Sequence, residues 1–443
     1  MKKVLALGLS AIMCVGLLAA CGGTASSGTP SSGGASSGGG SSAAVDLRVV
    51  SSFSGTDGNR KAFEDAYKAW ETETGNTVID ESQTSDETWK AKVVADFEAG
   101  SEPDVLFFFT NNDANSFIEA GKVISIEDIR KEYPEYASNM KDGSLPTSTV
   151  DGKAYAVPTT GYWEGLFVNE KVLADCGLTA PDANTTWAEF LEMCETIKAK
   201  GYTPIAVSLQ QVPHYWFEFT IMNNGGPGAT HLSVPTSSSD SSFAAWAGGL
   251  NDIKELYQKG YLPKNTLSAS DEETFQLMYD DKAAFAIDGS WKVGQIVEAV
   301  GEDRLDDYNV TFVPGKDNRK ATDIVGGLSM GYYITEKAWN DPAKREAAVS
   351  FITALTSDDV VNTMAGGTAQ TALATPGAKP ADLNSLQLKA FDMMAGATSV
   401  TPAVQDFIKP EAKDQILVTD TKLVANGDVT AEQAVENMIA ANG

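Results

Sequence analysis

The chain has 443 residues, of which 60 are Asp or Glu and 33 are Lys or Arg, so its formal net charge is −27. A surface this acidic repels nucleic acid and anionic lipid head groups, which excludes both as partners of the folded part. The stretch that can fold, about four hundred residues from Val45 onwards, is too long for one ordinary hydrophobic core, so two lobes are expected.

Residues 1–20 have the features of a secretory signal peptide. Lys2 and Lys3 form a basic start, and the uncharged apolar run 4–18 is too short to span a bilayer comfortably. The run ends in Leu18-Ala19-Ala20-Cys21, which resembles the lipobox of bacterial lipoproteins. The resemblance implies cleavage before Cys21 and a diacylglyceryl thioether on its sulfur. The alternative is an ordinary signal peptide followed by an accidental cysteine.

Residues 22–44 consist almost wholly of Gly, Ser, Ala, Thr and Pro. Such a chain buries no apolar surface, so residues 21–44 are expected to be a lipidated cysteine and a flexible tether with a reach of roughly 25 Å. Two cysteines remain further along, Cys176 and Cys194. In an exported protein they either form a disulfide or stay as buried free thiols.

The first part of the folded chain alternates between strand and helix patterns. Strands are expected at 47–51, 77–80 and 105–109, and helices around 63–70, up to 99, and at 117–120. Thr84 and Glu87 have the spacing of a capping box for the second helix. The run 105–109 is unbroken and apolar, which is typical of a strand covered on both faces. The order predicts an α/β lobe with a largely parallel sheet.

After about Pro158 the pattern becomes more helical. Helices are expected at 187–199, 243–258, 344–355 and over much of the chain from 381, and strands at 308–313 and 325–335. Thr186 or Thr185 is the expected cap for the first of these helices, and Thr430 with Gln433 for the last.

Five sequence blocks follow one another in the chain after Val45. They are Glu102-Pro103-Asp104 with the apolar run to Phe108; Asp151-Gly152-Lys153-Ala154-Tyr155-Ala156-Val157-Pro158 with 166–171; Gly177-Leu178 through Pro181 to Thr186-Trp187; 282–286 with Asp288-Gly289-Ser290-Trp291; and Val325-Gly326-Gly327 through Ile334 to 346–348. In this order and spacing they resemble the extracellular solute-binding proteins of ATP-binding-cassette (ABC) importers, in particular the family 1 branch that contains maltose-binding protein.

The resemblance implies an α/β, two-lobe periplasmic-binding-protein-like fold of type II, with a ligand cleft between hinged lobes. With crossings near Val157, Phe312 and Thr356, residues 45–157 plus 312–355 would form one lobe and residues 158–311 plus 356–443 the other. It further implies a monomeric carbohydrate receptor on the outer face of the cytoplasmic membrane. Such a receptor would need no cofactor and would hand its sugar to the permease subunits of an ABC transporter.

A sugar presents C–H groups on its ring faces and hydroxyls at its rim, so aromatic rings and planar polar groups should meet at the cleft. Four short segments offer such sets. The candidate ligand-binding residues are Tyr162, Trp163, Glu164, Asp288, Trp291, Gln211, Trp216, Asn111 and Asp113. For Trp163 and Trp216 the alternative is packing in the core, and core or surface packing is also expected of Trp70, Trp89, Trp187, Trp246 and Trp339.

Two other classes of function compete with this interpretation. An exported glycoside hydrolase would need two carboxyl groups at a defined separation, and Glu164, Glu218 and Asp288 are its possible partners. A receptor for a peptide, phosphate or metal would keep the fold and change the ligand. No metal site is expected, because His214 and His231 do not have the short helical spacing of paired ligands.

Overall fold

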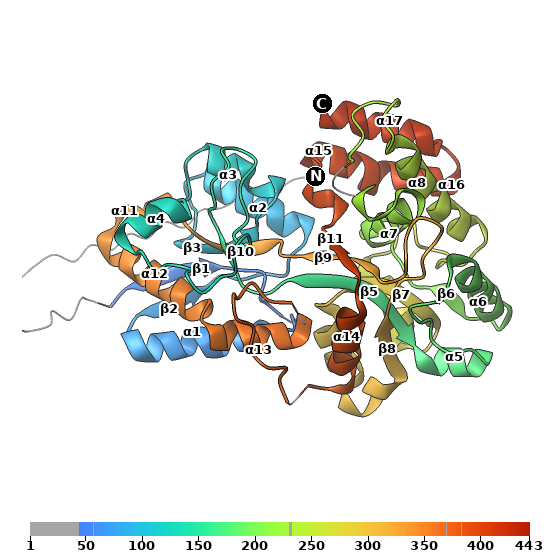
Figure 1. Cartoon of the computed structure of the whole chain (residues 1–443), viewed down its shortest axis with the longest axis horizontal. Coiled ribbons are helices and arrows are strands. Elements are labelled where there is room, and N and C mark those ends of the chain that lie inside the picture. The colour runs from blue at the N-terminus through green and yellow to red at the C-terminus, as the bar shows by residue number, and fades with distance from the viewer. Residues whose placement is uncertain (1–43, 56, 230–232, 369, 382) are drawn as a thin grey trace, which may run out of the picture. The chain divides into compact units, whose positions relative to one another are not determined.

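Two β-sheets form the framework of the protein in a computed structural model that describes residues 44–55, 57–229, 233–368, 370–381 and 383–443 (Figure 1). The expected signal peptide (1–20), Cys21 and the tether up to residue 43 lie outside the described residues. Residues 44–443 belong to one compact unit. Within the described ranges, no helix is both long and apolar enough to cross a membrane.

The first sheet has the strand order β2-β1-β3-β10-β4. Its strands are β1 (Asp46–Val50), β2 (Thr77–Asp80), β3 (Val105–Phe109), β4 (Val157–Pro158) and β10 (Met330–Ile334). The first three are parallel, as expected, and β10 runs antiparallel between β3 and β4. Helices pack on both faces of this sheet. They are α1 (Arg60–Thr74), α2 (Glu87–Glu98), α3 (Asn115–Glu119), α4 (Ile126–Glu132), α11 (Glu336–Asn340), α12 (Pro342–Leu355) and α13 (Asp358–Thr368).

The apolar run of β3 is buried on both sides, which confirms the expectation for 105–109. Phe107 faces a core that includes Trp70 and Phe351, whereas Leu106 and Phe108 face a second core on the opposite side of the sheet. Successive side chains of a strand point to opposite faces, so only a continuous apolar run fills both cores. Helix α2 begins differently from the prediction, because Asp86 accepts the backbone N–H of Trp89 and is the N-cap in place of Thr84.

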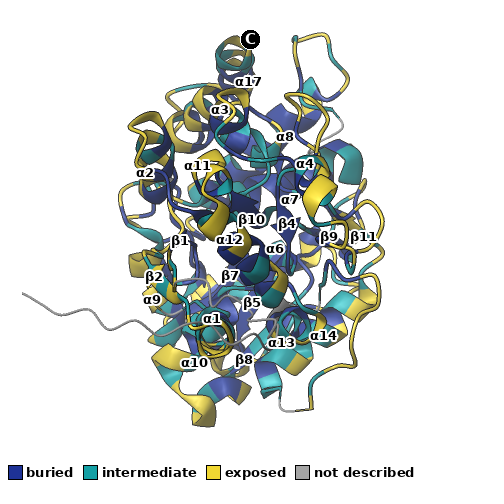
Figure 2. Cartoon of the chain, turned by 90° about the vertical axis from the view of Figure 1, so that its left-hand side faces the viewer, coloured by how far each residue is buried: buried dark blue, intermediate teal, exposed yellow. Residues whose placement is uncertain are grey.

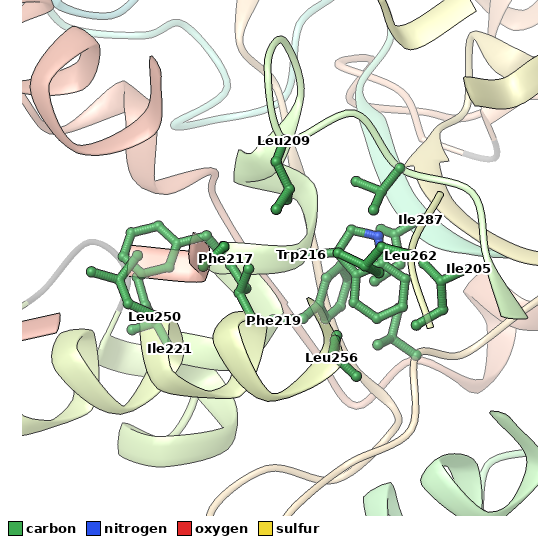
Figure 3. Close-up of a cluster of buried hydrophobic side chains, with 14 of the residues drawn as sticks. Ile205, Leu209, Trp216, Phe217, Phe219, Ile221, Leu250, Leu256, Leu262 and Ile287 are labelled. Atoms are coloured by element: carbon green, nitrogen blue, oxygen red, sulfur yellow. The ribbon is translucent and has the colours of Figure 1, made fainter. Parts of the chain in front are cut away.

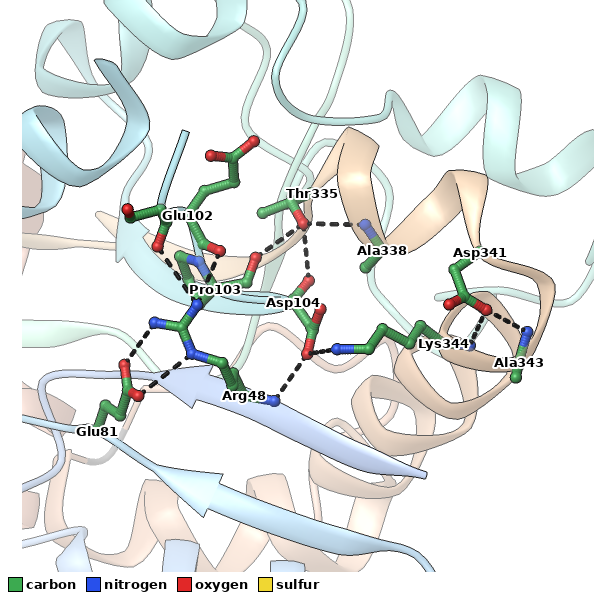
Figure 4. Close-up of polar contacts among 11 residues, drawn as sticks. Arg48, Glu81, Glu102, Pro103, Asp104, Thr335, Ala338, Asp341, Ala343 and Lys344 are labelled. Carbon is green, nitrogen blue, oxygen red and sulfur yellow. Dashed lines mark hydrogen bonds and ion pairs between the residues drawn. The ribbon is translucent and has the colours of Figure 1, made fainter. Parts of the chain in front are cut away.

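Asp104, in the turn before β3, joins three elements of the first sheet (Figure 4). Its Oδ2 accepts the backbone N–H of Arg48 at 2.8 Å and the ammonium of Lys344 at 2.7 Å. The Thr335 hydroxyl, at the end of β10, donates to the backbone carbonyl of Pro103 at 2.8 Å. The Pro-Asp pair of the first sequence block therefore holds β1, β3 and α12 together and is structural.

The second sheet has the order β11-β9-β5-β7-β6, with β8 also paired to β5. Its strands are β5 (Tyr162–Asn169), β6 (Thr203–Ile205), β7 (Ala283–Gly289), β8 (Tyr308–Thr311), β9 (Asp323–Gly327) and β11 (Ser399–Thr401). The helices that accompany this part of the chain are α5 (Glu170–Cys176), α6 (Trp187–Ala199), α7 (Pro213–Gly225), α8 (Phe243–Gln258), α9 (Asp271–Tyr279), α10 (Lys292–Val300), α14 (Ser385–Gly396), α15 (Pro410–Lys413), α16 (Thr421–Asn426) and α17 (Ala431–Asn442).

Short helical turns complete the described elements. They are the 3-10 turns η1 (Asn112–Ala114), η2 (Pro227–Ala229), η3 (Glu302–Asp307) and η4 (Val404–Asp406), and the π-helical turn η5 (Asp414–Asp420). Thr186 and Glu189 form a reciprocal capping box at the start of α6, and Thr430 caps α17, as the sequence predicted.

The chain passes between the sheets where β4 leads into β5 and where β9 leads into β10. The first passage lies between Pro158, the last residue of β4, and Tyr162, the first residue of β5. The second lies between Gly327 and Met330 and not near Phe312, because β9 pairs with β5 and β11 of the second sheet. The third also lies later than Thr356, because Val361 and Leu373 still belong to the core of the first sheet.

Buried residues lie mainly on the strands and on the inner sides of the helices, and exposed residues lie on the outside (Figure 2). The larger core of the second sheet contains Trp216, Phe217 and Leu250 from α7 and α8 (Figure 3). Cys176 and Cys194 are both buried in this core as free thiols. Of the two alternatives, the structure therefore has the free thiols and not the disulfide.

Candidate ligand-binding site

Three half-buried aromatic rings meet beside the passage from β4 to β5. Tyr162 is the first residue of β5, Tyr215 lies in the first turn of α7, and Trp291 follows β7. The ring centroid of Trp291 is 6.2 Å from that of Tyr162 and 5.9 Å from that of Tyr215. Rings at such separations form one continuous apolar surface with polar edges, which suits the face of a sugar ring.

Gly289 fixes the position of the Trp291 indole. A Cβ added to Gly289 would lie 2.1 Å from Cη2 of Trp291, so the indole packs directly on the backbone of the last residue of β7. The Tyr162 hydroxyl accepts the backbone N–H of Ala403 at 3.0 Å and so attaches the segment before η4 to β5. The Asp-Gly-Ser-Trp sequence therefore places its tryptophan beside Tyr162 and Tyr215.

Two buried glutamates lie next to this aromatic group. Glu164 comes from β5 and Glu218 from α7, and their side chains lie within hydrogen-bonding reach of each other. Neither Oε2 receives a hydrogen bond from another donor among the described residues. Two carboxylates this close in a buried site repel each other, so the arrangement favours the protonated form of at least one of them.

Burial is the main cause of the raised pKa of each glutamate. It raises the pKa of Glu164 well above its usual value, and the negative charge of Glu218 raises it further. Burial raises the pKa of Glu218 to about 8, although the hydrogen bond with Glu164 and the N–H of Val404, which donates to Glu218 Oε1 at 3.1 Å, oppose the change. Both carboxyl groups therefore keep a proton to a higher pH than an exposed glutamate does.

Asp288 belongs to a buried ion-pair network. Its Oδ2 lies 2.9 Å from the ammonium of Lys292, which also contacts Asp271 at 3.0 Å, and its Oδ1 accepts the backbone N–H of Gly289 at 2.7 Å. Burial raises the pKa of Asp288 to about 6, and the charge of Lys292 opposes that rise. Its carboxylate is thus already engaged by protein groups.

Trp163 and Trp216 pack in the core, and the structure corrects their placement in the cleft. Both are fully buried, Trp163 against Phe167 on one face of the second sheet and Trp216 among the rings of α6 on the other. Because β5 is covered on both faces, the Trp163 side chain cannot face solvent on either of them. Gln211 is exposed, and its Oε1 accepts the backbone N–H of Asp271 at 2.7 Å, which caps α9.

Asn111 and Asp113 follow β3 of the first sheet but contact residues that accompany the second. The Asn111 amide donates to Asp406 Oδ1 at 2.6 Å. Asp113 lies between two lysines, with Oδ2 3.4 Å from Lys90 and Oδ1 3.9 Å from Lys413. The structure therefore brings this loop against η4 and α15.

Three residues at the candidate site were not among the candidate ligand-binding residues: Tyr215, Glu218 and Asp406. Glu218 had been considered only as a possible carboxyl group of a hydrolase. Tyr215 and Glu218 are three residues apart in α7, a spacing that puts them on one helical face, so the helix pattern contained the signal for them. Asp406 lies in a three-residue turn with no periodic pattern. Among the residues that the structure describes, no group of three His, Cys, Asp or Glu side chains is placed to hold a metal ion.

Comparison with known proteins agrees with this architecture. Residues 55–362 match the family of bacterial extracellular solute-binding proteins. The chain is 24% identical over 236 residues to the multiple sugar-binding protein of Streptococcus mutans, an alignment that covers 52% of this chain and 54% of that relative. The match thus spans about half the length of that curated relative.

Solved structures with the same fold cover nearly the whole chain. A chitin oligosaccharide binding protein aligns with a TM-score of 0.75 and 24% identity, over 90% of this chain and 99% of that one. The GacH receptor of Streptomyces glaucescens, solved unliganded and with acarbose, aligns with a TM-score of 0.71 and 15% identity, over 90% and 98%. These likenesses show the two-lobe, type II periplasmic-binding-protein fold, and with the matched residues 55–362 the chain belongs to the bacterial extracellular solute-binding protein family.

Proposed function

We propose that the protein is an extracellular receptor that binds a sugar or oligosaccharide between its lobes and delivers it to an ABC transporter. The observation that carries this proposal is the aromatic group of Tyr162, Tyr215 and Trp291 beside the carboxyl group of Glu164. The rings suit the C–H faces of a pyranose, and the acidic and phenolic groups suit its hydroxyls. The names of the relatives support the same class of ligand.

The position of this group beside the interlobe passages favours ligand capture by closure. Tyr162 follows the β4–β5 passage, and its backbone pairs with Gly327 at the start of the β9–β10 passage. Its carbonyl oxygen also accepts a hydrogen bond from the Gln370 amide at 3.1 Å. A ligand there would contact the segments that change direction between the lobes, and ligand binding would shift the balance toward the closed form.

The proposal includes the location and the anchor of the receptor. Cleavage before Cys21 and lipidation of its sulfur would attach the protein to the outer face of the cytoplasmic membrane, with the Gly/Ser-rich segment as the tether. The folded part would be a monomer whose lobes divide at the passages β4–β5 and β9–β10 and after Leu373. The transporter would meet both lobes of the loaded, closed receptor.

A hydrolase fits the carboxyl geometry less well than a receptor does. Glycoside hydrolases hold their two carboxyl groups about 5 to 9.5 Å apart, on either side of the bond that they cleave. Glu164 and Glu218 instead lie within hydrogen-bonding reach of each other, and Asp288 is paired with Lys292. A receptor for another solute would keep the fold, and the aromatic rings favour a sugar over a phosphate or a metal ion.

A thermal-shift screen against mono- and oligosaccharides, followed by calorimetry, tests the proposal. A ligand at one hundred times its dissociation constant should stabilise the fold by about 2.7 kcal/mol. Trp291→Ala should then weaken binding about tenfold or more, because a stacking surface is lost. Trp339→Ala is the matched control, since Trp339 packs against Tyr133 and Arg345 beside the first sheet. Saturation by no sugar, or equal affinities of wild type and Trp291→Ala, would contradict the proposal.

A further inference from the structure

One hydrogen bond connects the loop after β3 directly to the turn η4. Asn111 Nδ2 lies 2.6 Å from Asp406 Oδ1, although Asn111 follows a strand of the first sheet and Asp406 lies beyond β11 of the second. An amide donor on a carboxylate acceptor is a charge-assisted hydrogen bond, which is stronger than a neutral one. This contact joins the two halves of the protein without any ligand atom.

An ion-pair group lies two residues further along the same loop. The carboxylate of Asp113 is shared by Lys90, on α2 of the first sheet's layer, and by Lys413, at the end of α15. The side chains of Lys90, Lys413 and Asp113 are 11%, 7% and 14% exposed, so water screens this group only weakly. A cation from the second half of the protein thus meets an anion–cation pair of the first.

The local structure holds both partners of the hydrogen bond in place. The Asn111 Oδ1 accepts the backbone N–H of Asp113 at 2.9 Å and caps η1, which leaves its amide nitrogen for Asp406. On the other side, Glu218 accepts the N–H of Val404, and Tyr162 accepts the N–H of Ala403. Two residues beside the candidate sugar site therefore position the turn that carries Asp406.

We infer that Asn111–Asp406 and Asp113–Lys413 form an interlobe clasp that stabilises the closed arrangement of the receptor, with Tyr162 and Glu218 as positioning residues for its η4 side. The inference rests on the proposed function and assigns Asn111 and Asp113 to closure instead of sugar contact. A sugar that holds Tyr162 in place would also hold η4 in place. Binding of the sugar and formation of the clasp would therefore be coupled.

Asn111→Ala tests the clasp, with Asn112→Ala as the matched control. The Asn112 side chain accepts hydrogen bonds from Asn115 and Thr149, which both lie in the same half of the protein as Asn112. Asn111→Ala should weaken sugar binding about tenfold, mainly through faster dissociation, because a hydrogen bond to a charged group is lost. Asn112→Ala should bind like the wild type. Equal dissociation rates for Asn111→Ala and the wild type would overturn the inference.

A distance measurement separates the clasp from a merely structural role. Spin labels on cysteines introduced at the exposed positions Glu73 (α1) and Glu436 (α17) report the separation of the two halves. Asn111→Ala should shift the distribution toward longer distances, and Asn111→Asp should shift it further, because two carboxylates would face each other. Unchanged distributions in both variants would overturn the clasp.

The same labels distinguish failure of the clasp from failure of the proposed function. Without sugar, the wild type should show a minor fraction at short, closed distances that Asn111→Ala loses, so this measurement supports or overturns the clasp even if no sugar binds the wild type. A double-mutant cycle with Asp406→Ala should show that Asn111→Ala adds little to Asp406→Ala. Fully additive effects would overturn the pairing.

Discussion

Glu164 and Glu218, one from β5 and one from α7, lie within hydrogen-bonding reach of each other in a fully buried site. Their raised pKa values link stability to pH. A carboxyl group whose pKa is raised on folding binds more protons in the native state than in the unfolded state. Stability is therefore highest at acidic pH and falls as the pH rises from the unfolded pKa, near 4.5, to the folded pKa.

The free energy of unfolding should accordingly fall by about 2 kcal/mol between pH 6 and pH 8. This pH range follows from Glu218, whose pKa is raised to about 8. Asp288 and Asp406, whose pKa values are raised to about 6, exchange their protons mainly below pH 6. Each pH unit over which one proton is exchanged contributes about 1.4 kcal/mol. Urea unfolding at the two pH values measures the difference.

Glu218→Gln should remove most of this pH dependence, because the carboxyl group that exchanges its proton in this range is replaced by an amide that does not titrate. The exposed Glu298→Gln is the control and should keep the wild-type slope. A slope in Glu218→Gln equal to that of the wild type would show that Glu218 does not cause the pH dependence.

Gly289→Ala should displace the Trp291 indole. The new Cβ would lie 2.1 Å from Cη2, which no native contact allows, so the ring must move from the aromatic group. We expect sugar affinity to fall about tenfold and stability by about 1–3 kcal/mol. In a Trp291→Ala background the same substitution should leave affinity unchanged. A further loss of affinity in that background would show that Gly289 acts by another route.

Arg319→Met should destabilise the fold by about 3 kcal/mol or more. The buried guanidinium donates to Asn223 and to the backbone carbonyls of Val313, Pro314 and Asp323, and its removal leaves those acceptors buried and unpaired. Its pKa is lowered to about 9 by burial. Arg304→Met, at a more exposed pair of carboxylates, should cost about 1 kcal/mol or less. Similar urea midpoints for the two variants would contradict this difference.

Cys21→Ala should release the protein from the membrane or leave its signal peptide uncut. Stable anchoring requires two acyl chains, which a diacylglyceryl group on the sulfur supplies. Fractionation of cells and the mass of the mature N-terminus check both outcomes. A variant that stays in the membrane fraction with a cleaved signal peptide would disprove lipidation at this cysteine.

The sequence predicted the elements of the fold better than their pairing. The strand β3 and the capping box of α6 follow from local patterns, which are independent of distant partners. The passage expected near Phe312 was wrong because β9 resembles any short apolar strand, and its partners β5 and β11 lie far away in the chain. Which sheet a strand joins is a long-range property.

The candidate site was predicted in part for a related reason. Two neighbouring residues of a strand, such as Tyr162 and Trp163, point to opposite faces of the sheet. Both faces of β5 are covered, so the sequence pattern could not show which of the two rings lies at the candidate site. Trp291 was identifiable because the Asp-Gly-Ser turn before it is local. Asp406 was not, because its role depends on the contact with Asn111 across the fold.

Closure of the two lobes on a sugar can be tested directly by small-angle X-ray scattering, with and without a sugar that binds in calorimetry. Two lobes joined by the β4–β5 and β9–β10 passages should close on the ligand, and a complete reversal from mostly open to mostly closed requires about 5.5 kcal/mol of preference for the closed form. We expect the protein to have a smaller radius of gyration when it is saturated with the sugar. A radius that stays the same while calorimetry shows saturation would contradict closure and indicate a rigid binding module.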